Sequence, residues 1–364
     1  MKKVLFIHNS IPEYRVVFWR YLGKYVSLKL VITNPDVEKK IYGLDKNIDG
    51  LDIEYVTSTS KGAWKQLVSE SEVVILPPID SPHEYIIAKV IRKMCIDEDK
   101  QFIYWTEKWV PSNNQQPLKK KIKNWVQTLM IKSVVKGANK CVASGSQSKE
   151  YLEKKVGVNP TNIHVAYDSS TSPQTITRED IRKKYAIPKE QKIILFLGRL
   201  ISRKGCDVLI KACSPLLKQG KYCLLIAGTG DAEESLKAQS NSIGNIHFVG
   251  KIQPIQRRDY FEQSDVFVLP SVIEGGVIEA WGLTVNEALE CGTPVIATDA
   301  VGAAYDLLNG RNGIMIKQAD AKALREGIVK VLSKLPDREE IKKEYSKYSV
   351  RQMALEFTQA ILSR

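Results

Sequence analysis

Residues 264–298 read SDVFVLPSVIEGGVIEAWGLTVNEALECGTPVIAT and contain two short apolar runs with a longer segment between them. The runs are DVFVLP at 265–270 and TPVIAT at 293–298, which have the composition of buried strands in parallel sheets. A helix is expected between them, beginning near Trp281 to Leu283. The succession of strand, helix and strand predicts a βαβ unit and therefore a parallel sheet.

The same alternation extends toward the N-terminus. Its other apolar runs are VLFI at 4–7, LKLVIT at 28–33, EVVIL at 72–76, FIYW at 102–105, KCVAS at 140–144, KIILFLG at 192–198, YCLLIAG at 222–228 and NIHFVG at 245–250. The alternation pauses at residues 167–178, a polar segment typical of a linker. We therefore expect an N-terminal α/β domain at 1–168 and a second at 169–345, with ligands bound beyond the carboxyl ends of the strands. Residues 346–364 are expected to form a helix that returns to the N-terminal domain.

The length and composition are consistent with this organisation. The 364 residues exceed the usual size of one domain and suit two. No apolar run reaches the roughly 18 residues that a membrane-spanning helix needs. The first apolar run ends at His8, which makes it too short for a signal peptide. Six scattered cysteines without a C-x-x-C pair are typical of reduced thiols, so a cytoplasmic location is predicted.

The net charge of +13 indicates an anionic partner or substrate. The excess is local, because no acidic residue lies between Glu107 and Glu150 while lysines are frequent at 118–140. This segment also has apolar residues near helical spacing. One interpretation is an interfacial helix that docks on anionic lipid at the inner face of the membrane and suits a lipid-linked acceptor. The alternative is an ordinary domain helix with its apolar face inward. No nucleic-acid-binding motif accompanies the lysines, so nucleic acid is not expected as a partner.

The turn GRLISRKG, residues 198–205, follows a predicted strand and precedes a predicted helix. Its glycines let the backbone approach a ligand, and Arg199 with Lys204 can neutralise a diphosphate at the helix start. The alternative is that the basic residues of the turn, including Arg203, are solvated loop charges.

Glu279 and Glu287 are separated by seven residues. A helix that begins between them places Glu279 in the preceding loop and Glu287 about one turn inside the helix. One carboxylate can then bond sugar hydroxyls and the other a ribose diol, while free backbone N–H groups at the helix start meet phosphate or sugar oxygens. The spacing alone leaves open that Glu279 caps the helix and that Glu287 is a surface residue.

Several motifs follow one another between residues 192 and 310, namely FLGRLISRKG, IAGTGDAEESL, HFVG, SDVFVLPS and EAWGLTVNEALECGTPVIAT. In this order they resemble the motifs of the retaining glycosyltransferases of family four, or group 1 glycosyl transferases. The last motif is similar to the Glu-x7-Glu motif of that family. The resemblance implies a GT-B fold, in which two Rossmann-like domains face each other across a cleft.

The resemblance also implies roles for particular residues. Arg199 and Lys204 match the pair that holds the donor diphosphate, Glu279 matches the contact to the transferred sugar, and Glu287 the contact to the ribose. Glu274 imitates the start of the motif, but its distance from Glu287 does not fit. The implied donor-binding residues are Gly198, Gly250, Lys251, Ile252, Trp281, Gly282, Leu283, Thr284 and Glu287.

The N-terminal half resembles the family less closely. Its first strand is followed by HNSIPEYRVVFW, with Pro12, Tyr14 and Arg15, where many members have a Gly-Gly loop. Many members also carry a histidine after the central strand, where this chain has Glu107. Glu107 is therefore a candidate catalytic residue, as a contact to the donor sugar or to the acceptor hydroxyl, with helix capping or a salt bridge as alternatives. His83 is a second candidate, although a histidine at a helix start is more typical of a structural role.

The resemblance implies a retaining transfer in which the leaving diphosphate helps to deprotonate the acceptor on the same face. No metal and no cofactor is expected, and Asp97-Glu98-Asp99 is interpreted as a solvated acidic turn. The expected partners are a nucleotide-sugar donor, UDP-sugar rather than GDP-sugar, and a glycan or lipid-linked acceptor in cell-surface polysaccharide or glycolipid synthesis. A sugar-nucleotide epimerase, a phosphorylase and a catalytically silent glycan-binding partner of another transferase remain as alternatives.

Overall fold

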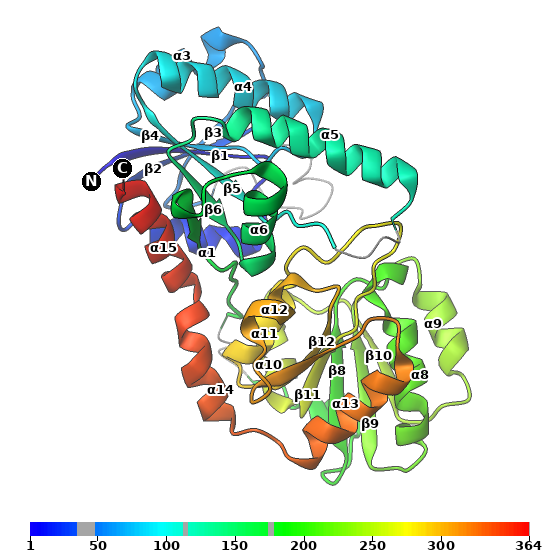
Figure 1. The fold of residues 1–364 in the computed structure, drawn as a ribbon. Helices are drawn as coiled ribbons and strands as arrows, with labels where there is room; N and C mark the ends of the chain where they lie inside the picture. The colour runs from blue at the N-terminus through cyan, green and yellow to red at the C-terminus, as the bar shows by residue number, and fades with distance from the viewer. Residues whose placement is uncertain (35–47, 112–115, 174–177, 364) are drawn as a thin grey trace. The chain divides into compact units, whose positions relative to one another are not determined.

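The computed structural model describes residues 1–34, 48–111, 116–173 and 178–363, and the ribbon is drawn in Figure 1. The chain divides into two compact units. The first unit comprises Met1–Ser169 and Val350–Arg364, and the second comprises Ser170–Ser349. The division thus falls one residue beyond the expected boundary at 168, and the returning segment begins at 350 instead of 346.

A fully parallel sheet of seven strands forms the centre of the first unit, in the order β3-β2-β1-β4-β5-β6-β7. Its strands are β1 (Lys3–His8), β2 (Ser27–Ile32), β3 (Asp52–Tyr55), β4 (Val73–Leu76), β5 (Gln101–Thr106), β6 (Lys140–Ala143) and β7 (Ile163–Val165). Its described helices are α1 (Glu13–Leu22), α3 (Lys61–Ser69), α4 (Pro82–Asp97), α5 (Leu118–Val135), α6 (Ser146–Tyr151), η1 (Leu152–Val156), η2 (Pro160–Asn162) and α15 (Val350–Leu362). The strand order reverses between β1 and β4, where ligands of doubly wound sheets usually bind.

Helices α1 and α15 bury an aromatic core against one face of this sheet. Phe6 of β1, Phe18 of α1, Trp105 of β5 and Phe357 of α15 belong to this core. The ring of Phe357 lies 4.9 Å from that of Phe18 and 5.3 Å from that of Trp105, in edge-to-face geometry. The last helix is therefore a core element of the first unit, as expected. Helices α3, α4 and α5 cover the other face (Figure 1).

The second unit has a parallel sheet of six strands in the order β10-β9-β8-β11-β12-β13. Its strands are β8 (Lys192–Leu197), β9 (Tyr222–Ala227), β10 (Ile246–Gly250), β11 (Val266–Leu269), β12 (Val295–Thr298) and β13 (Gly313–Ile316). Its described helices are α7 (Ile181–Lys184), η3 (Ser202–Lys204), α8 (Cys206–Leu217), α9 (Glu233–Ser240), η4 (Pro254–Gln256), α10 (Arg257–Gln263), α11 (Leu283–Glu290), α12 (Gly302–Leu307), α13 (Ala321–Ser333), α14 (Arg338–Tyr345) and η5 (Ser346–Tyr348).

Helices lie on both faces of the second sheet, which completes a Rossmann-like layering (Figure 1). On one face, Leu209 of α8 and Ile328 of α13 pack with Ile194 of β8 and Val268 of β11 in a buried core. Helices α10, α11 and α12 lie on the opposite face (Figure 1). The predicted class of two Rossmann-like α/β domains is therefore confirmed.

The polar segment between the units is more ordered than a typical linker. Its described residues include Asp168, Ser170 and Ser172, all of which are buried. Thr171 Oγ1 donates to Glu290 Oε1 at 2.7 Å, and Ser172 N donates to Glu290 Oε2 at 2.8 Å. The side chain of Thr171 and the backbone of Ser172 are thus both held by one carboxylate. Residues 174–177 lie outside the described part of the chain.

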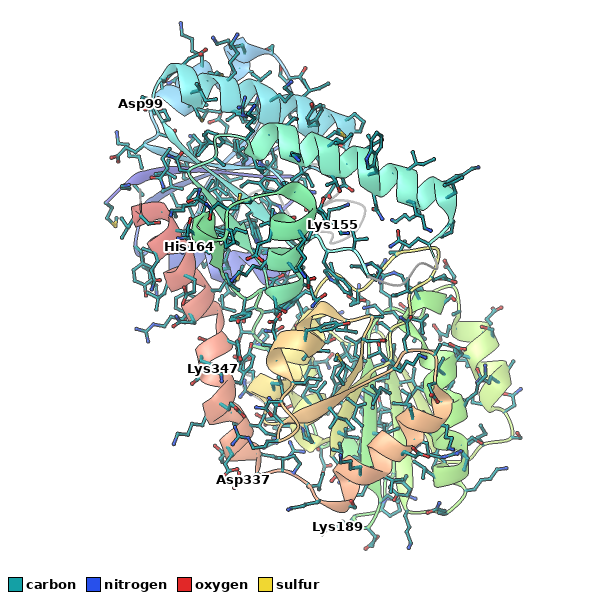
Figure 2. The ribbon with its side chains drawn as sticks, viewed as in Figure 1. Asp99, Lys155, His164, Lys189, Asp337 and Lys347 are labelled. Carbon is teal, nitrogen blue, oxygen red and sulfur yellow. The ribbon has the colours of Figure 1, made fainter. Side chains whose placement is uncertain are left out.

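The cysteines, the acidic string at 97–99 and the apolar helices lie in the fold as follows. All six cysteines are buried and free, which agrees with reduced core thiols. Asp99, labelled in Figure 2, lies in the exposed turn between α4 and the amino end of β5, so the acidic string at 97–99 is a solvated turn. Among the described helices, none is both long and apolar enough to cross a membrane.

Candidate functional site

Three loops meet at the carboxyl edge of the second sheet, after β8, β9 and β10. Leu200 N donates to Thr229 O at 2.9 Å, and Gly228 N donates to Gly250 O at 2.7 Å. A Cβ on Gly228 would lie 1.8 Å from Gly198 O, so this approach requires glycine. Gly198 and Gly250 of the predicted donor site therefore lie on either side of Gly228, in adjoining segments of backbone.

The basic turn before α8 is held against the loop that follows β11. Gly205 has a φ of +67°, and a Cβ on it would lie 2.0 Å from Pro270 O. Val272 N donates to Arg203 O at 2.8 Å. Because Gly205 precedes α8 directly, this contact brings Arg203 and Lys204 beside the loop that leads from β11 to α11.

Glu279 forms an ion-pair cluster with two residues of that turn. Its Oε2 lies 2.6 Å from Lys204 Nζ and 3.1 Å from Arg203 Nη1. Its backbone is also fixed, because Glu279 N donates to Ala300 O at 3.0 Å and Gly302 N donates to Glu279 O at 3.1 Å. The helix-capping alternative is wrong for Glu279, and the solvated-loop alternative is wrong for Lys204 and Arg203. Arg203 is a residue of the cluster that the sequence analysis did not select.

The cluster carries more positive than negative charge. Burial raises the pKa of Glu279, but Lys204 and Arg203 outweigh burial and hold that pKa below its ordinary value. Burial lowers the pKa of Lys204, and Glu279 opposes this only in part, while Arg203 and Arg199 lower the pKa further. Among the described residues, the exposed Arg199 side chain makes no hydrogen bond or ion pair. Such a surplus of cations favours a multiply charged anion.

The first turn of α11 adjoins this cluster. The helix begins at Leu283, within the range expected from the sequence. Gly282 precedes it with a φ of +98°, and no side chain caps the helix. The buried Trp281 donates from Nε1 to Asn286 Oδ1 at 2.8 Å, which fixes the indole at the helix start. The backbone N–H groups of the first turn, which includes Thr284, are therefore suited to an oxygen of a phosphate or sugar.

Glu287 is buried inside α11, so the interpretation of a surface residue is wrong. Its Oε1 lies 3.1 Å from Arg257 Nη1 and accepts from Ser170 Oγ at 3.4 Å. Burial raises the pKa of Glu287 to about 7, and Arg257 opposes this shift only in part. Glu287 thus has partners of its own, which differ from those of Glu279. Of the two remaining predicted contacts, Lys251 is exposed and Ile252 is buried after β10.

A pH dependence follows from the raised pKa of Glu287. Between its ordinary value of 4.5 and about 7, the folded state holds a proton that the unfolded state has lost. The stabilisation by this proton is complete below about 4.5 and is lost as the pH rises through about 7. Glu287→Gln keeps a neutral side chain, so we expect its stability relative to the wild type to increase from pH 5 to pH 8 by about 1–3 kcal/mol. Urea unfolding at both pH values measures this difference, and parallel pH profiles would contradict it.

A second polar cluster lies at the carboxyl edge of the first sheet. The Arg15 guanidinium on α1 pairs with Asp168, which follows β7, through Nη1 and, at 2.8 Å, through Nη2. Its Nη2 also bonds Glu107, which follows β5. Arg15 and Asp168 are almost fully buried, whereas 35% of the Glu107 side chain is exposed. The guanidinium also stacks 4.6 Å from the Trp105 ring centroid.

Glu107 is therefore ion-paired, as one alternative from the sequence had it, while its side chain remains partly exposed. Burial and the nearby charge of Asp168 raise its pKa to about 7, while Arg15 acts in the opposite direction. Glu107 was predicted from the sequence, whereas no role was predicted for Asp168, and Arg15 was noted only as a departure from the family. The two carboxylates are 61 positions apart, so no local motif could connect them.

Two histidines of the first unit have clear structural partners. His83, at the start of α4, bonds Thr57 O at 2.8 Å through Nε2. His8, at the end of β1, bonds Ser10 O at 2.7 Å through Nδ1 and packs against the Trp105 ring at 5.8 Å. Burial, with a contribution from Arg15, lowers the pKa of His8 to about 4, so its imidazole is neutral at pH 7. Its position at the carboxyl edge was not recognised from the sequence.

The sequence of this chain is similar to those of known glycosyltransferases. The model of the family "Glycosyl transferases group 1" matches residues 177–348. An uncharacterised glycosyltransferase of Methanocaldococcus jannaschii is 31% identical over 185 residues, 49% of this chain and 46% of that protein. A Bacillus subtilis protein is 30% identical over 201 residues, 55% of this chain and 48% of that protein. Its provisional name is teichuronic acid biosynthesis glycosyltransferase TuaC. The chain thus spans about half the length of these curated relatives.

Solved structures extend the likeness to both units. The Anabaena protein HepE, in a crystal structure with UDP, superposes with a TM-score of 0.74 at 15% identity, over 100% of both chains. At this identity the likeness concerns the fold, which is the expected GT-B fold. The family match covers the turn that carries Arg203 and Lys204, the loop that carries Glu279 and the helix that carries Glu287. Residues 177–348 thus match the family that the sequence motifs resemble, the group 1 glycosyl transferases.

Proposed function

We propose that the protein is a retaining glycosyltransferase that moves a sugar from a nucleotide-sugar donor to a glycan or lipid-linked acceptor. The synthesis of a cell-surface polysaccharide or glycolipid is its proposed setting. The observation that carries this proposal is the contact of Glu279 with Lys204 and Arg203 beside the uncapped start of α11. It joins a cationic site for a diphosphate to a carboxylate for sugar hydroxyls. The name of TuaC supports the setting in polysaccharide synthesis.

The proposed reaction follows from the charges in this cluster. Lys204 exchanges Glu279 for a phosphate oxygen of the donor, and Arg199 contributes a second positive charge. Glu279 then accepts a hydrogen bond from a hydroxyl of the transferred sugar. As the bond from the sugar to the diphosphate breaks, the basic residues stabilise the leaving charge, and a diphosphate oxygen takes the proton of the acceptor hydroxyl on the same face. Because side chains supply the positive charge, the proposed reaction is independent of metal.

The carboxylate of Glu107 is the proposed polar contact of the first unit. Arg15 orients it, and its exposed part is open to a hydroxyl of the donor sugar or of the acceptor. A UDP-sugar is the proposed donor, and crystal structures of HepE with UDP and with UDP-glucose support this choice. The ribose contact proposed for Glu287 requires the ribose to approach the Arg257 pair. The proposed location is cytoplasmic, at the inner face of the membrane, with the lysines of residues 118–140 toward the lipid.

A donor panel tests the proposal directly. In thermal unfolding, we expect UDP and UDP-sugars to raise the melting temperature more than GDP and GDP-sugars, because a ligand that binds only the folded state stabilises it. With an acceptor present, we expect transfer with the anomeric configuration retained, as measured by NMR of the product, and at an unchanged rate in EDTA. Loss of transfer in EDTA would contradict independence of metal. Conversion of the donor without any acceptor would instead identify an epimerase, and binding without any reaction a silent partner.

A further inference from the structure

Helix α5 has its apolar side chains on the outside. Five large apolar residues of its first twelve positions are exposed, namely Leu118 at 72%, Ile122 at 53%, Trp125 at 63%, Val126 at 43% and Leu129 at 46%. At 100° per residue they fall within a sector of about 100°. These five residues, which we call the α5 stripe, therefore form one continuous apolar face in water.

The side of the same turns that faces the protein is polar. Asn124 Nδ2 donates to Gln116 Oε1 at 3.0 Å, and Gln127 Nε2 donates to the backbone of Ile79 at 2.6 Å. Thr128 Oγ1 lies 2.9 Å from the hydroxyl of Tyr151. This arrangement is the reverse of an ordinary surface helix, which buries apolar and exposes polar residues. The alternative of an inward apolar face is therefore wrong for the first two thirds of α5.

The last third of α5 anchors the helix to the first unit. Ile131, Val134 and Val135 are buried there. Arg92 of α4 donates to the carbonyl of Lys136 at 3.0 Å through Nε, and at 2.6 Å through Nη2. Figure 1 shows α5 beside α4, with its N-terminal turns running beyond it. The stripe thus lies on a projecting segment whose base is held firmly.

Lysines flank the stripe on both sides. On the helical wheel, Lys121 and Lys132 border one edge, and Lys119 and Lys123 lie beyond the other. The side chains of Lys119, Lys123 and Lys132 make no hydrogen bond or ion pair with any described residue. The segment from 108 to 149 contains no acidic residue. A second copy of this face would bring lysines against lysines, whereas an anionic bilayer offers acyl chains to the stripe and negative headgroups to the lysines.

We infer that the α5 stripe inserts into the interface of an anionic lipid bilayer, with its flanking lysines at the headgroups and the helix parallel to the surface. This inference rests on the proposed function, which it deepens, because a lipid-linked acceptor lies at the surface of a membrane. Insertion of the apolar stripe, and not attraction of the lysines alone, is the specific claim. The contact is peripheral, since the opposite side of the helix is packed against the first unit.

The tryptophans provide a direct probe. Of the six, Trp19, Trp64, Trp105, Trp109 and Trp281 are buried, and Trp125 of the stripe is the exposed one. Vesicles of phosphatidylcholine with phosphatidylglycerol should therefore shift the emission of the full chain to the blue and carry the protein in flotation. Pure phosphatidylcholine vesicles should do so much more weakly. In Trp125→Phe, the blue shift should disappear while flotation persists.

Matched charge variants separate insertion from electrostatics. Trp125→Glu and Val329→Glu each add one negative charge at an exposed apolar site, the second on α13, where Val329 is 41% exposed. We expect Trp125→Glu to weaken binding to the anionic vesicles by about tenfold or more, and Val329→Glu to leave it nearly unchanged. Equal losses in the two variants would overturn insertion and leave charge alone. Circular dichroism at the working temperature confirms that both variants are folded.

Other outcomes would also overturn the inference. Absence of flotation with anionic vesicles would do so. So would a dimer in sedimentation velocity that Trp125→Glu dissociates, because the stripe would then be covered by a second copy. The vesicle experiments need neither donor nor acceptor. A failure of sugar transfer and a failure of membrane binding are therefore separate results.

Discussion

Lys204→Ala is expected to lower kcat for sugar transfer by about 100- to 1,000-fold, the usual effect of removing one group that stabilises charge in a transition state. Lys204 is the cation closest to Glu279, at 2.6 Å, and its side chain is only 12% exposed. A buried ammonium stabilises a leaving diphosphate more strongly than a solvated one, because less water screens it. Steady-state kinetics with a saturating donor measure the change.

Glu274→Gln is the matched control for this variant. Glu274 belongs to the loop between β11 and α11, is exposed, and bonds Ser202 Oγ at 2.6 Å. The substitution changes the charge of the loop that carries Glu279 by one unit, without removing a partner of Glu279. We expect nearly wild-type kcat for Glu274→Gln. Similar losses in Glu274→Gln and Lys204→Ala would show that any change of charge near Glu279 lowers kcat, and would refute the specific role of Lys204.

Arg15→Met is expected to lower the free energy of unfolding by about 3–5 kcal/mol, as the loss of one partner from a buried ion pair usually does. The main cause is Asp168, which is 1% exposed and would keep a buried charge without its cation. Glu107 contributes less, because its 35% exposed side chain can be hydrated. Urea unfolding at pH 7, with the change in melting temperature as a second readout, measures the effect.

Two further variants test the origin of that loss. Arg20→Met lies on the same helix, is exposed, and bonds only the backbone of Asp49 at 3.0 Å among the described residues, so a change within about 0.5 kcal/mol is expected. Asp168→Asn in the Arg15→Met background should recover part of the lost stability, because it removes the unpaired charge. If the double variant is as unstable as the sum of the single variants, the ion pair is not the cause.

The interior strands of both sheets were predictable from the sequence, and so was the edge strand β10, but the other three edge strands were not. β8, β9, β11 and β12 coincide closely with predicted runs, because strands covered on both faces consist almost wholly of apolar residues. β3, β7 and β13 were missed, and each lies at the end of its sheet. Their sequences, DIEY, IHV and GIMI, are short and carry partly exposed residues. An edge strand has less to bury and so leaves a weaker pattern.

The donor site was predictable to the level of its loops, but not to the level of its contacts. The motif placed Glu279 before a helix and the basic turn before another, and both positions are correct. The pairing of Glu279 with Arg203 as well as Lys204 was not predictable from the motif. Nor was the exposure of Arg199, whose side chain bonds no described residue. Two arginines four residues apart in one turn look alike in a sequence, whereas the folded turn, packed at Gly205 against Pro270, places Arg203 and not Arg199 at the carboxylate.

The sequence alone therefore determined the local features of this protein. These are the alternation of strands with helices, the glycines that let loops approach each other, and the segment that carries a glycosyltransferase motif. Tertiary structure alone decided which side of an amphipathic helix meets the protein and which distant charges meet each other. The α5 pattern is equally compatible with an inward or an outward stripe, because helical periodicity defines a face but not its direction. Likewise Arg15 and Asp168, 153 positions apart, meet because β1 and β7 end at the same edge of one parallel sheet.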